Sequence, residues 1–319
     1  MKRVQFNTFG GPEVLNIVDV AAPHAGPGQV RIQVRAAGIN ASDWIKRRGR
    51  MDAALPQTMG YEAAGIVDQV GAGVTDIRPG ARVFGFCVDG AAQAELAVLT
   101  YYSVIPSVLD FATAASLPVA LETSARALDQ LGVGEGACLL VNGASGNIGA
   151  AAVQLALARG ARVIGVASSA KADPVRALGA EPVPYGPDMV RRVRELAPRG
   201  VDRVLDVAGN GVLPDLIALA GQARHVVTVA DFAGAQAHGV RFSRGDDGRA
   251  LYVLGQIGEL LDAGRFRLPA VQCFPLAEVA QAHRVGEAGQ ATGKLVLTVG
   301  PLETPVRVAA ENPRTAPTA

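Results

Sequence analysis

The chain has 319 residues, of which 49% are hydrophobic and 18% are charged, and its formal net charge at pH 7 is +1. This length accommodates two domains, and a near-neutral chain without a basic block argues against nucleic acid as a partner. Its three cysteines are far apart, which excludes a disulfide framework or a cysteine zinc site. No signal peptide opens the chain and no apolar run of about 20 residues occurs. We therefore expect a cytoplasmic protein with no membrane partner.

The first 112 residues predict a β-rich domain. Short strand-like runs, such as residues 29–39 and 63–71, are separated by glycine and proline. A proline-glycine turn within residues 74–86 precedes a further strand. Closely spaced strands of this kind are typical of a compact, partly closed barrel.

From about residue 113 the pattern changes to alternating helices and strands. Residues 113–132 predict one helix, and the strands that follow are continuous Val, Ile and Leu runs, as in a parallel sheet covered on both faces. This alternation predicts a doubly wound domain over residues 113–262. Residues 263–319 return to the first domain, and we expect the polar tail from about residue 301 to be mobile.

The sequence NGASGNIG, at residues 142–149, lies between an apolar run and a helical run. Gly143 and Ala144 form the turn, Gly146 removes a side chain where a phosphate would approach, and Gly149 lets the helix pack on the strand. Ala144 replaces the second glycine of the usual fingerprint, which is tolerated if the turn avoids positive φ there. We therefore predict a dinucleotide-binding site. Its residues are Gly143, Ser145, Gly146, Asn147, Ile148 and Gly149.

The choice of cofactor depends on the end of the second strand, about 20 residues further on. An NAD site would place a carboxylate there, whereas this chain has Ser168, Ser169 and Lys171. Hydroxyl donors and a cation suit a 2′-phosphate, which favours NADPH. The alternative is that Lys171 is a solvated residue of the next helix. Tyr185, after the third strand, either closes over the phosphate or adenine or packs as an ordinary aromatic residue.

Several motifs in order resemble the zinc-independent quinone oxidoreductases of the medium-chain dehydrogenase/reductase superfamily. They include RAAGINASDWIKRRG, MGYEAAGIVDQVGAGVTDIRPGARVFGF, the glycine turn and the closing ATGKLVLTV, and they span nearly the whole chain. The resemblance implies an α/β fold with a GroES-like β-rich catalytic domain, made by residues 1–112 and 263–319, and a Rossmann NADPH-binding domain. It also implies a homodimer or a homotetramer, of which we expect the homodimer.

The resemblance also assigns site residues. Asn40 and Tyr61 stand where zinc-dependent relatives carry cysteine and histidine, and the four-cysteine loop is missing, so we expect no metal. Asn40 is the predicted donor to the substrate, with capping of the loop before Asp43 as the alternative. Tyr61 is a candidate proton donor that would otherwise line the pocket or the core. The resemblance assigns these residues to the cofactor: Thr123, Val229, Ala230, Phe232 and Lys294.

These features predict hydride transfer from NADPH to quinones or conjugated enones. Without a metal, the acceptor must be activated by conjugation, and the resulting enolate or phenolate needs hydrogen-bond donors and a proton. Ile45 stands where enoyl-thioester reductases carry a proton-donating tyrosine, which favours quinones. Two alternatives remain. One is an enoyl or alkenal reductase of lipid or polyketide metabolism, with Arg47, Arg48 and Arg50 as a cationic entrance. The other is a non-catalytic NADPH-binding protein.

Overall fold

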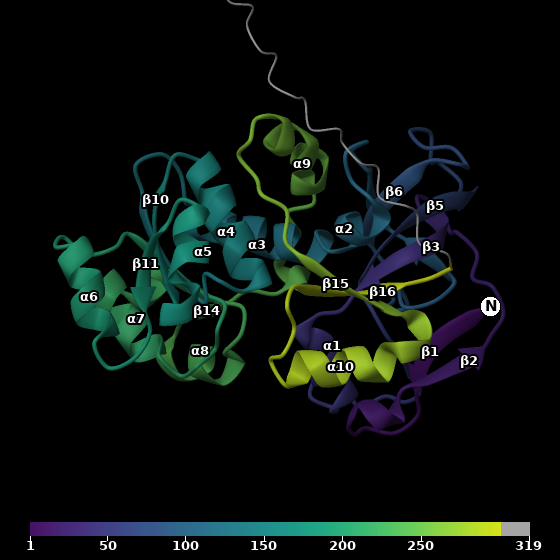
Figure 1. Cartoon of the computed structure of the whole chain (residues 1–319), viewed down its shortest axis with the longest axis horizontal. Helices are drawn as coiled ribbons and strands as arrows, with labels where there is room; N and C mark the ends of the chain where they lie inside the picture. The colour runs from purple at the N-terminus through teal and green to yellow at the C-terminus, as the bar shows by residue number, and fades with distance from the viewer. Residues whose placement is uncertain (301–319) are drawn as a thin grey trace, which may run out of the picture.

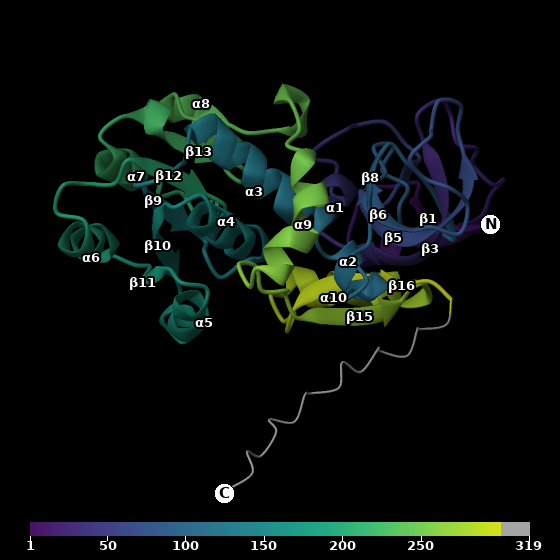
Figure 2. The same cartoon turned by 90° about the horizontal axis from the view of Figure 1, so that it is seen from above.

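A computed structural model of the protein describes residues 1–300, so the tail predicted to be mobile lies outside the described residues. The chain forms two lobes. In Figure 1 a Rossmann-like lobe lies on the left and a β-rich lobe on the right, and helix α9 (Tyr252–Asp262) lies above their junction. The view from above, in Figure 2, shows the same helix between the two lobes.

The β-rich lobe contains two sheets. The smaller has the order β2-β1-β4, and the larger has the order β15-β16-β3-β5-β6-β8, with β7 also paired to β3. The strands are β1 (Lys2–Phe6), β2 (Asn16–Asp19), β3 (Val30–Gly38), β4 (Gln57–Thr58), β5 (Glu62–Val70), β6 (Arg82–Phe86), β7 (Leu96–Leu99), β8 (Tyr101–Val104), β15 (Val271–Pro275) and β16 (Lys294–Thr298).

Strands from both ends of the described chain meet in the larger sheet. Strand β16 pairs antiparallel with β3, so that Val296 lies opposite Gly38 and Thr298 opposite Ala36. In Figure 1 the yellow strand β16 accordingly lies beside the purple-blue β3. Helix α10 (Val279–Glu287) packs on β16 and on α1 (Ala41–Arg47). Because the chain returns to this lobe, Lys294 lies next to residues that come from the first 70 positions of the sequence.

The other lobe is a six-stranded parallel sheet with the order β11-β10-β9-β12-β13-β14. Its strands are β9 (Cys138–Asn142), β10 (Arg162–Ala167), β11 (Glu181–Pro184), β12 (Arg203–Asp206), β13 (Val226–Thr228) and β14 (Arg241–Phe242). Its helices are α4 (Asn147–Ala158), α5 (Ala172–Ala177), α6 (Met189–Leu196), α7 (Leu213–Ala220) and α8 (Phe232–His238). The predicted doubly wound fold is confirmed.

The central strand β9 explains why its sequence is continuously apolar. Leu139 and Val141 belong to one hydrophobic cluster, whereas Leu140, between them, belongs to another. Successive side chains of a strand point to opposite faces, so β9 is buried on both sides. A parallel sheet covered by helices on both faces requires this pattern.

The single helix predicted over residues 113–132 is wrong in one respect, because the structure has two helices there. Helix α2 (Phe111–Ala115) begins at Asp110, whose carboxylate accepts the Thr113 N–H at 2.7 Å. Helix α3 (Pro118–Leu131) begins with Pro118. Proline has no N–H and its ring clashes with the preceding turn, so it starts a new helix.

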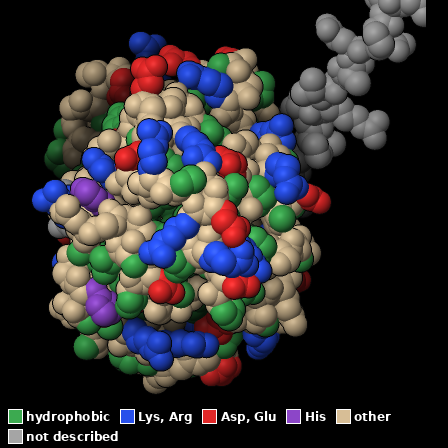
Figure 3. Space-filling model, turned by 90° about the vertical axis from the view of Figure 1, so that its left-hand side faces the viewer, with side chains coloured by type: hydrophobic (Ala, Val, Ile, Leu, Met, Phe, Trp, Pro, Cys, Tyr) green, Lys and Arg blue, Asp and Glu red, His purple; other side chains and the backbone are tan. Residues whose placement is uncertain are grey.

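The outer surface of the Rossmann lobe carries charges of both signs. Figure 3 shows basic and acidic side chains interspersed on this end. Among residues 1–300, no helix has both the length and the apolar character needed to cross a membrane.

Candidate active site

The glycine turn between β9 and α4 has the geometry that its sequence predicts. Gly143 adopts φ +93°, which favours glycine, whereas Ala144 is buried and no residue other than glycine has positive φ within residues 1–300. A Cβ on Gly149 would lie 2.1 Å from the Gly143 carbonyl oxygen. Only glycine therefore allows the helix to approach the strand this closely.

The first turn of α4 is suited to an anion. Gly146 is the N-cap, no side chain caps the helix, and a Cβ on Gly146 would meet no atom closer than 3.5 Å. The N–H groups of Asn147, Ile148 and Gly149 have no partner within the helix, because the first N–H groups of any helix lack one. These N–H groups and the positive end of the helix dipole fit a cofactor pyrophosphate.

The residues predicted to select NADPH lie at the neighbouring strand ends. Ser168 and Ser169 follow β10, and Lys171 lies in an exposed single turn before α5. Tyr185 follows β11, and its backbone N–H donates to the Ala167 carbonyl at 3.0 Å, which ties the two strand ends together. Its side chain is 60% exposed, so it is not a core residue. The contact of these residues with a cofactor remains a prediction.

A buried network that the sequence analysis missed lies at the carboxyl ends of three strands. Asp206, which ends β12, accepts from Asn142 Nδ2 at 2.9 Å and from Thr228 Oγ1 at 2.8 Å. The same carboxylate accepts the backbone N–H groups of Ala208 and Gly209 at 3.1 and 3.2 Å. Asp206 thereby fixes the loop after β12 and joins it to β9 and β13.

The network extends to the residues predicted to meet the nicotinamide. The Thr228 hydroxyl oxygen accepts the N–H groups of Ala230 and Asp231 at 3.2 and 3.1 Å. It thus shapes the segment that carries Val229, Ala230 and Phe232. Phe232 is 50% exposed and its ring packs edge-on against Phe242, with 5.2 Å between centroids.

In the β-rich lobe, Asn40, Glu62 and Lys294 form a closed polar group. Glu62 Oε1 accepts from Asn40 Nδ2 and from Lys294 Nζ, both at 2.7 Å, and the Lys294 ammonium also donates to Asn40 Oδ1. Glu62 Oε2 accepts the Val119 N–H of α3 at 2.7 Å, which links the two lobes. Glu62 is fully buried, and Gly38 leaves it room, since a Cβ there would lie 2.2 Å from Oε1.

The cap of α1 leaves the amide of Asn40 available for this group. The Asp43 carboxylate accepts the backbone N–H of Asn40 at 2.7 Å, and the Asp43 N–H donates to the Asn40 backbone carbonyl at 3.0 Å. Asn40 is therefore the N-cap of α1 and forms a capping box with Asp43, and its side chain also bonds to Glu62 and Lys294. Burial raises the pKa of Asp43 to about 6, against the opposing effect of the Asn40 N–H.

Tyr61, the other candidate catalytic residue, has different neighbours. Lys46 Nζ lies 5.1 Å from the centre of its ring, and both side chains border Gly90. Burial, followed by the nearby Asp43 charge, raises the pKa of Tyr61 to about 12. Tyr61 thus keeps its proton at neutral pH. Among the described residues its hydroxyl has no hydrogen bond to the Asn40 group.

Comparison with known proteins identifies the chain's relatives. Residues 26–110 match the family described as "Alcohol dehydrogenase GroES-like domain", and residues 178–297 match "Zinc-binding dehydrogenase". The solved quinone oxidoreductase of Coxiella burnetii is 30% identical, with a TM-score of 0.80 over 94% of this chain and 99% of that one. The chain belongs to the quinone oxidoreductase family of the medium-chain dehydrogenase/reductase superfamily.

Two curated relatives of similar identity have names other than quinone oxidoreductase. The chloroplastic "NADPH-dependent alkenal/one oxidoreductase" of Arabidopsis thaliana is 30% identical over 93% of this chain and 79% of that protein. The "Spectinabilin polyketide synthase system protein NorB" of Streptomyces orinoci is 34% identical. That match covers 93% of this chain but 14% of the much longer synthase protein. Membership of the quinone oxidoreductase family establishes an oxidoreductase that uses a nicotinamide cofactor.

The residues present do not fit the zinc ion after which one matching family is named. Asn40 and Tyr61 offer an amide and a protonated phenol, and the Lys294 ammonium already binds Glu62. In the described part of the chain, no group of three or more His, Cys, Asp or Glu residues is arranged to hold a metal ion.

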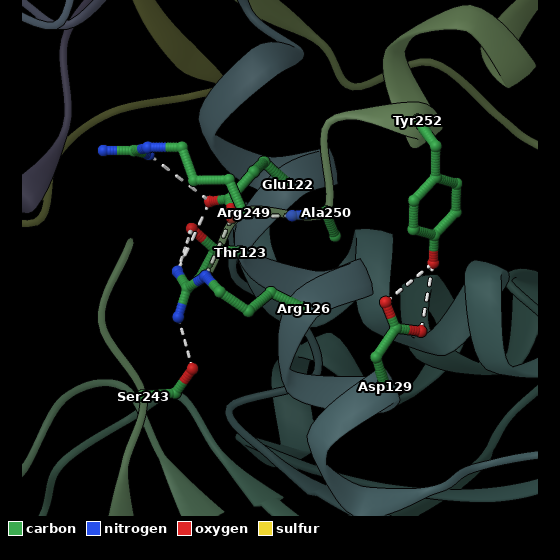
Figure 4. A network of polar contacts seen from close by, with 8 residues as sticks. All are labelled: Glu122, Thr123, Arg126, Asp129, Ser243, Arg249, Ala250 and Tyr252. Atoms are coloured by element: carbon green, nitrogen blue, oxygen red, sulfur yellow. Dashed lines mark hydrogen bonds and ion pairs between the residues drawn. The ribbon is translucent and has the colours of Figure 1, made fainter. Parts of the chain in front are cut away.

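Thr123, which the family resemblance assigns to the cofactor, lies on α3 in a second buried network (Figure 4). Arg126 Nη2 is 3.5 Å from the Thr123 hydroxyl, and the same guanidinium binds both oxygens of Glu122, at 2.8 and 3.3 Å, and the hydroxyl of Ser243. The network joins α3 to the segment that follows β14.

The cationic entrance proposed for Arg47, Arg48 and Arg50 is wrong for Arg47. Its side chain is fully buried and pairs with Glu287 of α10, and Arg48 lies 3.2 Å from the same carboxylate. Neighbouring His283 is buried, and among the described residues neither of its ring nitrogens has a hydrogen-bond partner. Burial lowers its pKa to about 3, with a further contribution from Arg47. This cluster holds α10 against α1.

Two surface hollows lie elsewhere, on either side of Arg265. Their volumes are about 290 and 310 Å³, and they border the C-terminal half of α4. None of the predicted site residues lines them. The ends of the strands and the Asn40 group therefore remain the candidate active site.

Proposed function

We propose that this protein transfers a hydride from NADPH to quinones or conjugated enones and needs no metal ion. The observation that carries the proposal is the closed group of Asn40, Glu62 and Lys294, which is held at the junction of the two lobes by the Val119 N–H. We also propose that the protein acts as a cytoplasmic homodimer.

The cofactor fits the Rossmann lobe. NADPH supplies the hydride when bound, and the N–H groups at the start of α4 would hold its pyrophosphate. Ser168, Ser169 and Lys171 would hold the 2′-phosphate, because hydroxyls and an ammonium are donors that suit a phosphate. The segments fixed by Asp206 and Thr228 would border the nicotinamide.

Asn40 and Lys294 would stabilise the charge that develops on the acceptor oxygen. An amide nitrogen carries two N–H donors and an ammonium three. In residues 1–300, Asn40 Nδ2 uses one with Glu62, and Lys294 uses two with Glu62 and Asn40. One donor on each therefore remains for an enolate or phenolate oxygen. Because the Lys294 ammonium faces Oδ1 of Asn40, the amide cannot flip and present its oxygen instead.

The proton then comes from solvent or from Tyr61. A phenol with a pKa of about 12 donates only to a more basic anion. An enolate is a stronger base than a hydroquinone anion, so Tyr61 would matter more for enones than for quinones. This difference leaves quinone reduction independent of a dedicated acid.

Reduction of alkenals or enoyl thioesters is the second candidate. It is supported by the resemblance to the Arabidopsis alkenal/one oxidoreductase and to the synthase protein NorB. The test measures NADPH oxidation with 1,4-benzoquinone, 9,10-phenanthrenequinone, a 2-alkenal and crotonyl-CoA, with NADH in parallel and with a chelator. Quinone turnover that prefers NADPH and survives the chelator supports the proposal. Activity only with the alkenal or thioester selects the second candidate, and tight NADPH binding without turnover indicates a non-catalytic binder.

A further inference from the structure

Arg249 lies beside the candidate active site, in the segment between β14 and α9. Its guanidinium carbon is 5.4 Å from the centre of the Phe86 ring, and its Nη1 is 3.8 Å from Oε2 of Glu122. Phe86 is the register partner of Glu62 in the β5–β6 pair. Directly opposed residues of an antiparallel pair lie on the same face of the sheet. Arg249 is therefore near the Asn40 group, at the junction of the lobes.

The Glu122 carboxylate, which Arg249 faces, is already paired with another arginine. Arg126 binds both of its oxygens, and the Ala250 N–H lies 3.3 Å from Oε1. At 3.8 Å, the contact of Arg249 is longer than a hydrogen bond. Figure 4 shows Arg249 on the side of Glu122 away from Ser243. The Glu122 carboxylate thus faces two guanidinium groups, and Arg126 makes the shorter contacts with it.

The donors of Arg249 have no hydrogen-bond acceptor within residues 1–300, although a guanidinium carries five N–H groups. The side chain is 31% exposed, so a ligand can reach it. The other arginine of this network, Arg126, is buried, and each of its three nitrogens already makes a hydrogen bond. Arg249 is accordingly the cation of this network that can bind a further anion.

The guanidinium of Arg249 is bordered by Gly245 and by the ring of Phe86. A Cβ on Gly245 would lie 2.7 to 2.9 Å from three of its atoms, so a larger residue at position 245 would displace it. On another side it lies over the face of Phe86, an arrangement that is attractive for a cation. A planar, delocalised guanidinium is well suited to two-point recognition of a carboxylate, sulfonate or phosphate.

We propose that Arg249 is a specificity-determining residue that binds an anionic substituent on the acceptor, so that the protein prefers quinones or enones that carry a carboxylate, sulfonate or phosphate group. This inference rests on the proposed function. The reducible carbonyl would lie at Asn40 and Lys294, and the anionic substituent at Arg249.

The experiment compares 1,2-naphthoquinone with 1,2-naphthoquinone-4-sulfonate as acceptors for NADPH oxidation. The full chain is measured as wild type, Arg249→Met, Arg249→Lys and the control Arg244→Met, which changes an exposed arginine of the same segment. The quantity of interest is the ratio of kcat/KM for the sulfonate to kcat/KM for the neutral quinone. Comparing this ratio between variants cancels the different intrinsic reactivity of the two quinones.

We expect Arg249→Met to lower the ratio about tenfold to 100-fold, mainly through the KM for the sulfonate, since hydrogen bonds to charged groups have this strength. Arg249→Lys should recover part of the loss, and Arg244→Met should leave the ratio unchanged. An unchanged ratio in Arg249→Met, with both quinones still reduced, overturns the inference and leaves the proposed function intact. A raised KM for NADPH with an unchanged ratio assigns Arg249 to a cofactor phosphate and also overturns it. Failure of the wild type to reduce either quinone overturns both.

Discussion

Two buried carboxylates, Glu62 in the β-rich lobe and Asp206 in the Rossmann lobe, organise the two halves of the candidate active site in different ways. Glu62 is bound by a cation, an amide and one backbone N–H. Asp206 is bound by neutral donors, namely an amide, a hydroxyl and two backbone N–H groups. In both groups the carboxylate oxygens accept hydrogen bonds. Only in the Glu62 group does a cation, Lys294, balance the carboxylate charge.

The two carboxylates therefore have different structural roles. A carboxylate paired with an ammonium holds a further polar group, Asn40, in one orientation while the cation remains available to a developing negative charge. A carboxylate that collects backbone N–H groups instead fixes the path of loops, here those after β12 and β13. The β-rich lobe thus positions side chains, whereas the Rossmann lobe positions backbone.

The largest effect is expected when the cation is removed from Glu62. Lys294→Met leaves a buried carboxylate without its partner, which should lower the free energy of unfolding by about 3–5 kcal/mol. It should also lower kcat about 100-fold or more through the loss of a donor to the acceptor oxygen. Chemical denaturation and steady-state kinetics measure the two effects.

The double variant Glu62→Gln with Lys294→Met is the matched control. It removes both charges, so it should recover most of the stability but none of the activity. A double variant that is no more stable than Lys294→Met would show that the pair does not carry the stability assigned to it.

A smaller effect is expected at the neutral network. Asp206→Asn replaces an acceptor oxygen with an N–H₂ group that faces other donors, which should lower the free energy of unfolding by about 2–3 kcal/mol. Because the loops after β12 and β13 loosen, the Kd for NADPH should rise about tenfold. Denaturation and fluorescence titration test this, with the exposed Asp215→Asn of α7 as control. Unaltered NADPH affinity would contradict the role given to these loops.

The buried cluster of Arg47, Glu287 and His283 extends the comparison to pH. Among the described residues, neither ring nitrogen of His283 has a hydrogen-bond partner. His283 stays neutral in the folded protein because its pKa is about 3, whereas an unfolded histidine takes up a proton below about pH 6.5. Stability is therefore lost as the pH falls through this window. The effect of His283→Phe on the free energy of unfolding should therefore be more stabilising at pH 5 than at pH 8, by about 2 kcal/mol. The exposed His238→Gln should show no such pH-dependent gain in denaturation curves.

The smallest effect concerns an exposed cation outside these networks. Lys171→Gln should lower the ratio of kcat/KM for NADPH to that for NADH about tenfold, since one charge-assisted contact is lost. Arg176→Gln, on the short helix α5 that follows Lys171, is the control because Arg176 already pairs with Asp173. Equal use of NADH by the wild type would refute the assignment of Lys171.

The features predicted correctly from sequence depend on residues close together in the chain. The glycine turn needs only Gly143 and Gly149 around a strand end and a helix start, and the structure confirms positive φ at Gly143 but not at Ala144. The break before α3 was missed, although Pro118 marks a helix start. Polar residues that end the apolar runs VLD and VVT were the unused signal for Asp206 and Thr228.

The features that escaped prediction depend on strand register and on helices that arrive late in the chain. The contact between Lys294 and Glu62 follows from the pairing of β16 with β3, which no local pattern specifies. Arg47 was predicted to be part of a cationic entrance, which requires an accessible side chain. Its burial results from α10, more than 200 residues later, which supplies Glu287.

The pairing of β16 with β3 also has a consequence for biosynthesis. As the chain leaves the ribosome, the strands of the Rossmann lobe are complete well before β16 is synthesised, and domains generally fold as units during translation. Glu62 must wait, without its ammonium partner, until Lys294 emerges. The polar group proposed to act on the acceptor is therefore complete only after β16 has been synthesised and has paired with β3.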